Sequence, residues 1–86
     1  MNKHLASVTI LSDDRHANAT AMQKVMTDRG RLIRARLGVN LVPSCAAKCN
    51  GLIVLAVEGT LSEIKELTAA FNKLKSVKAK STVITK

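Results

Sequence analysis

The stretch LIVLAVEGTLSE, residues 52–63, decides the fold that we expect for this chain. Its first six residues are all apolar, which is typical of a central strand whose two faces are both covered. Thr60 and Glu63 then form a capping box, in which each side chain accepts the other residue's free backbone N–H at a helix start. The apolar residues of the predicted helix lie three or four positions apart, at Leu61, Ile64, Leu67, Phe71 and Leu74. A buried strand followed by an amphipathic helix is therefore predicted.

The rest of the chain supplies a second helix and three further strands. Residues 5–11 alternate between apolar and polar side chains, which predicts a half-buried strand. Residues 16–30 carry an apolar stripe that includes Met22 and Met26, and Gly30 is a helix stop. Residues 32–42 again alternate, with apolar side chains at every second position, which predicts another strand. Residues 75–84 form a weakly apolar strand, in which Lys78 and Lys80 are typical of a sheet edge.

This order, β-α-β-β-α-β, predicts an α+β, ferredoxin-like fold. We expect a four-stranded antiparallel sheet with both helices on one face and the first and third strands in the centre. The 86 residues are enough for a single domain, residues 1–86. A domain of this size buries only about 60% of its surface. We therefore expect a homo-oligomer, a dimer or tetramer, that covers the sheet face away from the helices or the edge strands.

The net charge favours nucleic-acid binding, whereas the aromatic content argues against recognition of unpaired bases. The formal net charge is +8, which favours an acidic partner such as nucleic acid. Phe71 is the single aromatic residue, however, and stacking on unpaired bases needs aromatic platforms. Sequence-independent binding to DNA phosphates therefore stays open as an alternative function. No apolar run approaches the roughly 18 residues of a membrane span, and no signal peptide is legible. We expect a cytoplasmic protein without membrane contact.

Several segments carry a resemblance to one family. They are Asp13-Asp14-Arg15 after the first strand, GRLIRARLGV at residues 30–39, the VEGT that ends residues 52–60, and VKAK at residues 77–80. On these segments the chain resembles ACT-like proteins proposed to regulate the iron-only hydrogenase system. Their sheet is similar to the regulatory domain of the nickel-responsive repressor. The resemblance implies an ACT-like fold and a non-enzymatic, ligand-sensing role in transcriptional regulation.

The resemblance to the nickel repressor does not extend to its functional parts. That repressor holds DNA with a ribbon-helix-helix domain, for which this chain has no spare residues. Its nickel site needs His and Cys ligands that converge on one metal. His4 and His16 lie far from any Cys in this sequence. We therefore expect no nickel site here.

The sequence offers five candidate residues for a ligand site. Arg34 and Arg36 are expected on the same face of their strand, where they could hold an anion; a solvated strand face is the alternative. Asp13 and Asp14 lie at the turn where, by the resemblance, ACT-like domains bind effectors; helix capping is the alternative. Gly38, inside the same strand as the arginines, predicts a bulge or a close backbone approach.

Cys45 and Cys49 are the candidate metal ligands. Thiolates bind zinc and iron–sulfur clusters, but such sites usually take three or four protein ligands. Two chains of a dimer would have to share the site. Two reduced thiols in a loop are the alternative that we favour, and a redox disulfide is a third. We therefore expect no cofactor unless one binds here. No nucleophile–base pair or paired carboxylates are legible, so we expect no enzyme.

Overall fold

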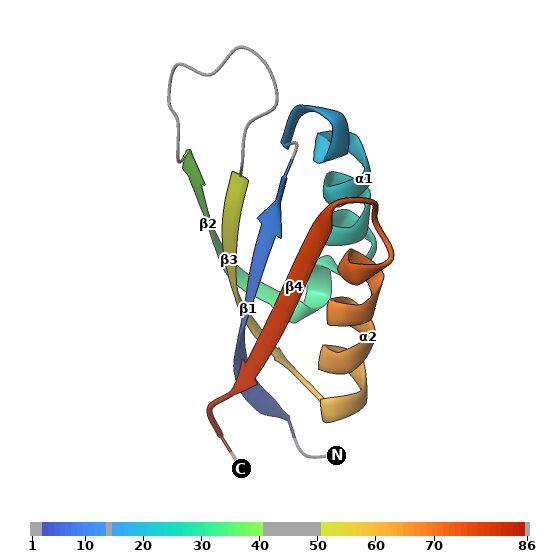
Figure 1. Cartoon of the computed structure of the whole chain (residues 1–86). Coiled ribbons are helices and arrows are strands. Elements are labelled where there is room, and N and C mark those ends of the chain that lie inside the picture. Colours follow the sequence, from blue (N-terminus) through green and yellow to red (C-terminus); the bar gives the residue numbers. More distant parts are fainter. Residues whose placement is uncertain (1–2, 14, 41–50, 86) are drawn as a thin grey trace.

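The computed structural model describes residues 3–13, 15–40 and 51–85. The elements are β1 (His4–Ser12), α1 (Arg15–Asp28), a 3-10 turn (Gly30–Leu32), β2 (Ile33–Asn40), β3 (Gly51–Gly59), α2 (Leu61–Asn72) and β4 (Val77–Val83). The strands form one antiparallel sheet in the order β2-β3-β1-β4, and both helices lie on one face of it (Figure 1). The predicted ferredoxin-like fold is confirmed, with β1 and β3 in the centre.

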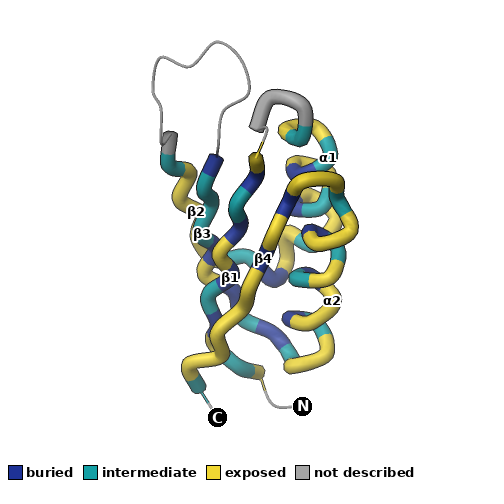
Figure 2. The backbone as a smooth tube through the Cα atoms, in the orientation of Figure 1, coloured by how far each residue is buried: buried dark blue, intermediate teal, exposed yellow. Residues whose placement is uncertain are grey.

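The hydrophobic core lies between the sheet and the helices, where Figure 2 shows the buried segments. Ile64, Leu67 and Phe71 of α2 are all fully buried, as their spacing predicts. Leu61, which the same spacing assigns to the buried stripe, is 48% exposed. They pack with alternate residues of the two central strands, such as Ile10 and Leu55. Burial of each large apolar side chain contributes about 1.5–3 kcal/mol, so this layer supplies most of the stabilisation.

The capping box at the start of α2 is present. The Glu63 backbone N–H donates to Thr60 Oγ1 over 3.1 Å, and the Thr60 N–H donates to Glu63 Oε1 over 2.9 Å. Arg31 Nη1 lies 2.8 Å from Glu63 Oε2, which links the turn before β2 to the helix. The same carboxylate therefore starts α2 and holds the turn of Gly30–Leu32 against it.

β4 is an edge strand, as its lysines predict, and part of its free edge is occupied. The Asn72 side chain at the end of α2 donates from Nδ2 to the Ala79 carbonyl over 3.0 Å. The Ala79 N–H donates to Asn72 Oδ1 over 2.8 Å. The Asn72 amide thus takes the place of a neighbouring strand at this point, which discourages pairing with another chain.

The sheet face away from the helices, here called the outer face, is apolar mainly over β2 and β3. Its side chains are those of Leu5, Ser7, Thr9 and Leu11 on β1, Arg34, Ala35, Leu37 and Val39 on β2, Leu52, Val54, Ala56 and Glu58 on β3, and Lys78, Lys80 and Thr82 on β4. The expected two-sided apolar character of β3 is confirmed, because its alternate residues reach both the core and this face.

The expectation that Arg34 and Arg36 share a face is wrong. The pairing of β2 with β3 shifts between Ile33 and Ala35, which face Val57 and Ala56 respectively. This bulge leaves Arg34 as an extra residue on the outer face, whereas Arg36 pairs with buried Leu55 and faces the helices. A bulge reverses the alternation of side chains along a strand.

The bulge predicted at Gly38 is therefore displaced to the start of β2. Among the described residues the expected close backbone approach is not found either, because a Cβ atom built on Gly38 meets none of their atoms within 4 Å. Gly38 pairs with Ile53, whose alternate neighbour Leu55 is buried, so that Cβ would point to the helix side of the sheet. Gly38 leaves open space there, and this space belongs to the site described below.

Gly59 and Gly38 offer a matched test of the packing. A Cβ atom at Gly59 would lie 2.9 Å from Leu32 Cδ2 and 3.2 Å from Glu63 Oε1. We expect Gly59→Ala to lower the free energy of unfolding by about 1–3 kcal/mol through overpacking. Gly38→Ala should leave it unchanged or raise it by up to about 1 kcal/mol. Urea denaturation at equal protein concentration measures both, and equal losses would contradict this account.

Glu63 predicts an acid-sensitive contribution to stability. The pKa of Glu63 is lowered from its usual 4.5, chiefly because its carboxylate accepts the Thr60 backbone N–H, with Arg31 adding to the effect. A carboxyl whose pKa is lower in the folded state stabilises the fold above its unfolded pKa and loses this contribution as pH falls. Wild type should therefore exceed Glu63→Gln in denaturation midpoint near neutral pH, and the difference should shrink as the pH falls below 4.5. A difference independent of pH would contradict the assignment.

Candidate functional site: a cavity between α1 and β2

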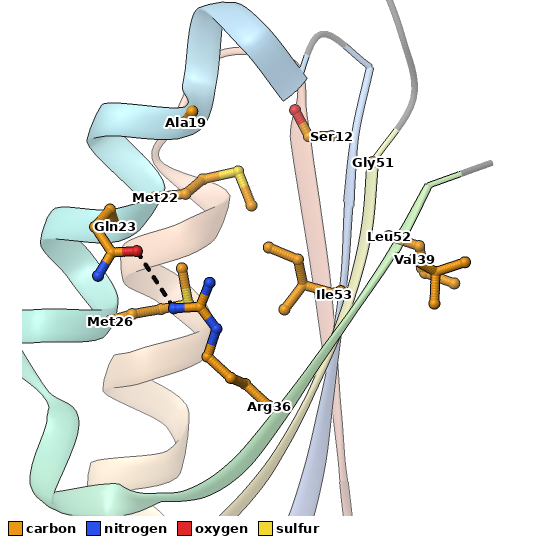
Figure 3. A pocket seen from close by; sticks show the side chains of 11 residues that line it. Ser12, Ala19, Met22, Gln23, Met26, Arg36, Val39, Gly51, Leu52 and Ile53 are labelled. Carbon is orange, nitrogen blue, oxygen red and sulfur yellow. Dashed lines mark hydrogen bonds between the residues drawn. The ribbon is translucent and has the colours of Figure 1, made fainter. Parts of the chain in front are cut away.

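A cavity of about 390 Å³ lies between α1 and the strands β2 and β3 (Figure 3). It exists because the two helices cover the sheet unequally. α2 makes most of the close backbone approaches to the strands, whereas α1 makes few. The buried side chains of Met22 and Met26 span part of the gap, as flexible thioether chains commonly do. The remaining volume falls within the range of roughly 300–1,000 Å³ that is usual for small-molecule pockets.

Small residues keep this space open. Gly38 of β2 and Gly51 of β3 line it from the sheet, and Ala19 lines it from α1. Ile53 points from β3 toward the helix, while the side chains of Val39 and Leu52 lie on the other side of the strands (Figure 3). A larger side chain at position 38 would occupy the cavity directly, since its Cβ has no neighbour within 4 Å.

Arg36 brings a positive charge to the cavity. Its Nη1 donates to Gln23 Oε1 over 3.3 Å (Figure 3). Gln23 Nε2 in turn donates to Thr27 Oγ1 over 3.3 Å. The amide of α1 thereby orients the guanidinium across the space between strand and helix. Among the described residues, no carboxylate forms an ion pair with Arg36. Its charge is thus left without an acidic partner in this part of the chain.

Ser12 supplies a second polar group at the end of β1. Its side chain is fully buried, and its Oγ accepts a hydrogen bond from Asn18 Nδ2 over 3.1 Å. The described lining contains no carboxylate, imidazole or thiol. The arrangement can therefore bind an anion through Arg36 and an apolar body through Met22 and Met26, but these described residues offer no acid–base pair for chemistry.

The structure separates the residues that the sequence groups as one ligand site. Arg36 and Gly38 line the cavity. Asp13 is exposed at the end of β1 and its backbone N–H donates to the Ser76 carbonyl over 3.0 Å. Arg34 lies on the outer face, where its Nη2 is 3.1 Å from Glu58 Oε1. Two of these four residues therefore meet, and two do not reach the cavity.

Three further predicted residues, Asp14, Cys45 and Cys49, lie outside the described residues. The metal or iron–sulfur site at the two cysteines stays a prediction. Within residues 3–13, 15–40 and 51–85, no three His, Cys, Asp or Glu side chains are grouped to hold a metal ion.

Sequence reasoning missed the contributions of Ser12, Gln23 and Ile53. Two glycines in the strands, Gly38 and Gly51, were the available signal, because glycine in a strand marks a missing side chain. No comparable signal existed for Gln23. Its role depends on how α1 is rotated and how far it stands from β2.

Comparison with known proteins identifies the family. A family model described as "TM1266-like: Iron-only hydrogenase system regulator, putative" matches residues 4–81. The chain belongs to this family. The match spans nearly the whole chain and confirms the resemblance that the sequence segments carry. The TM1266-like family is described as a regulator of the iron-only hydrogenase system. No curated protein matches the chain.

Solved structures support the same fold. Protein TM1266 of Thermotoga maritima superposes with a TM-score of 0.85 at 17% identity, over 96% of this chain and 99% of that one. The ACT domain of GTP pyrophosphokinase from Chlorobium tepidum gives 0.76 at 13% identity, over 94% and 100%. CutA1 from Oryza sativa gives 0.61 at 10% identity, over 96% and 82%. Identities this low show an ACT-like fold and nothing of a shared ligand.

The described helices are short. None in the described part of the chain is long and apolar enough to cross a membrane.

Proposed function

We propose that this chain is a non-enzymatic, ligand-sensing regulator that self-associates in the cytoplasm and takes part in transcriptional control of the iron-only hydrogenase system. Family membership supports the regulatory role. The cavity at Arg36 supports ligand sensing. Self-association is carried by one observation, the uncovered outer face of the sheet.

The outer face has the character of an interface. Leu37 is 62% exposed and Leu5 is 50% exposed, and apolar residues of β3 lie between them. Among the described residues, its charged side chains are the lysines on β4 and the Arg34–Glu58 ion pair, which lies at the end of the face where β2 begins and β3 ends. A contiguous apolar surface bordered by polar groups marks an interaction site in soluble proteins.

A second copy of this chain is the occupant that we assign to this face. Leu37 projects from it, and a hollow of about 280 Å³ on the same face is lined by Leu5, Ala56 and Ile84. In a two-fold interface every contact occurs twice, so each Leu37 can fill the partner's hollow. Two sheets stacked face to face at about 30° are a common packing of this kind.

The area of the outer face is also sufficient. Strands about eight residues long, at about 3.3 Å per residue, and four strands about 4.8 Å apart give on the order of 500 Å² per copy. Two copies would bury on the order of 1,000 Å², which reaches the lower limit for a specific interface. A chain this short gains stability from such a contact.

Leu37→Lys tests the interface against a matched control. We expect wild type to run as a dimer or tetramer by size-exclusion chromatography with light scattering. Leu37→Lys should run as a monomer, because it buries a charge at the contact. Leu61→Lys makes the same change at a leucine that is 48% exposed on α2, outside the outer face, and should keep the wild-type size. A monomeric wild type, or an oligomer unaffected by Leu37→Lys, would contradict the assignment.

Deletion of the gene tests the regulatory role. Transcript levels of the iron-only hydrogenase genes should change severalfold relative to wild type, and a plasmid copy should restore them. Unchanged levels under both inducing and repressing conditions would contradict the proposed function.

The exposed lysines of β4 and the net charge of +8 keep direct DNA binding as a mode of this regulation. Titration against duplex DNA at about 100 mM salt distinguishes direct DNA binding from regulation through a protein partner, because phosphate contacts should still give measurable binding at this salt concentration. Absence of binding would leave a protein partner as the route to the genes.

A further inference from the structure

We propose that the cavity between α1 and β2 binds a small organic monoanion, with its carboxylate at Arg36 and its apolar body against Met22, Met26 and Ile53, and that it discriminates against amino acids. This inference rests on the proposed ligand-sensing function and names the class of ligand.

The arginines indicate where the carboxylate of the ligand would bind, because they differ in their ion pairs. Arg31 and Arg34 each have a glutamate partner, at 2.8 Å and 3.1 Å. Arg36 has none among the described residues and instead bonds to the neutral amide of Gln23. A guanidinium presents several N–H donors in a planar fork that matches a carboxylate. The bond from Nη1 to exposed Gln23 favours one orientation of this fork.

The apolar residues that line the rest of the cavity indicate where the hydrocarbon part of the ligand would lie. Met22 and Met26 are buried but flexible, and Ile53 points from β3 into the same space. Gly38 places no side chain there. Walls of this kind accept a short branched hydrocarbon, because methionine adapts its shape to the occupant.

The weaker binding expected for amino acids rests on the lack of an acidic side chain among the described residues that line the cavity. An α-ammonium group bound beside the carboxylate would lie close to Arg36, and the described lining contains no acidic side chain to pair with it. Arg36 is exposed, and like charges at short range repel each other even where solvent weakens the interaction. A zwitterion of the same carbon skeleton should therefore bind more weakly than the simple acid.

Three probes with one skeleton separate these requirements. Isothermal titration of the full-length chain with 4-methylpentanoate should give saturable binding. Leucine adds the ammonium group and should bind at least tenfold more weakly. The alcohol 4-methyl-1-pentanol lacks the charge and should also bind at least tenfold more weakly. Equal binding of leucine or of the alcohol would overturn the inference, as would no saturable binding of 4-methylpentanoate up to about 10 mM, the weak limit for a ligand of this size.

Two variants locate the binding. Arg36→Gln should weaken 4-methylpentanoate at least tenfold and leave the alcohol unchanged. Arg34→Gln makes the same change two positions away on the outer face and should bind as wild type does. Gly38→Leu should abolish binding by filling the cavity without lowering the denaturation midpoint, since space for its side chain exists. Equal effects of Arg34→Gln and Arg36→Gln would overturn the inference, even if Gly38→Leu fails to fold.

The outcomes also distinguish this inference from the proposed function. Tight binding of leucine that Gly38→Leu abolishes would overturn the ligand class and leave ligand sensing intact. Hydrogenase transcripts that do not respond to deletion of the gene would overturn the proposed function, whatever the cavity binds.

Discussion

The packing of α2 onto the two central strands is the contact on which the rest of the structure depends. Ile64, Leu67 and Phe71 are fully buried against β1 and β3, and the capping box fixes where the helix begins. Asn72 at the other end of the helix joins it to β4. One helix thus contacts three of the four strands, β1, β3 and β4.

The unequal position of the two helices follows from this packing and creates the site. α2 approaches β4, β1 and β3 closely, whereas α1 makes few close backbone approaches to any strand. Met22 and Met26 bridge the gap only in part. A cavity with apolar walls and one cation is what remains. The core beside it, buried between α2 and the central strands, supplies most of the stabilisation.

A single register shift gives the two faces of β2 different chemistry. The bulge at Arg34 sends that arginine to the outer face, where Glu58 pairs with it, and Arg36 to the helix side. The same shift places Ala35, Leu37 and Val39 together on the outer face. Without the bulge, both arginines would project on one side. The separation leaves a surface suited to a second copy on one side and a site suited to an anion on the other.

The sequence alone determined the element order, the helix start at Thr60, the central place of β3 and the edge place of β4. These depend on local patterns: the capping box, the spacing of Ile64 and Leu67, and the lysines of residues 75–84. Tertiary structure alone decided which faces Arg34 and Arg36 occupy and that Gly38, Gln23 and Ser12 meet at one cavity. A bulge depends on pairing with a neighbouring strand, and a cavity depends on the distance between a helix and a sheet. Both are set by packing between segments far apart in the chain, which local patterns do not encode.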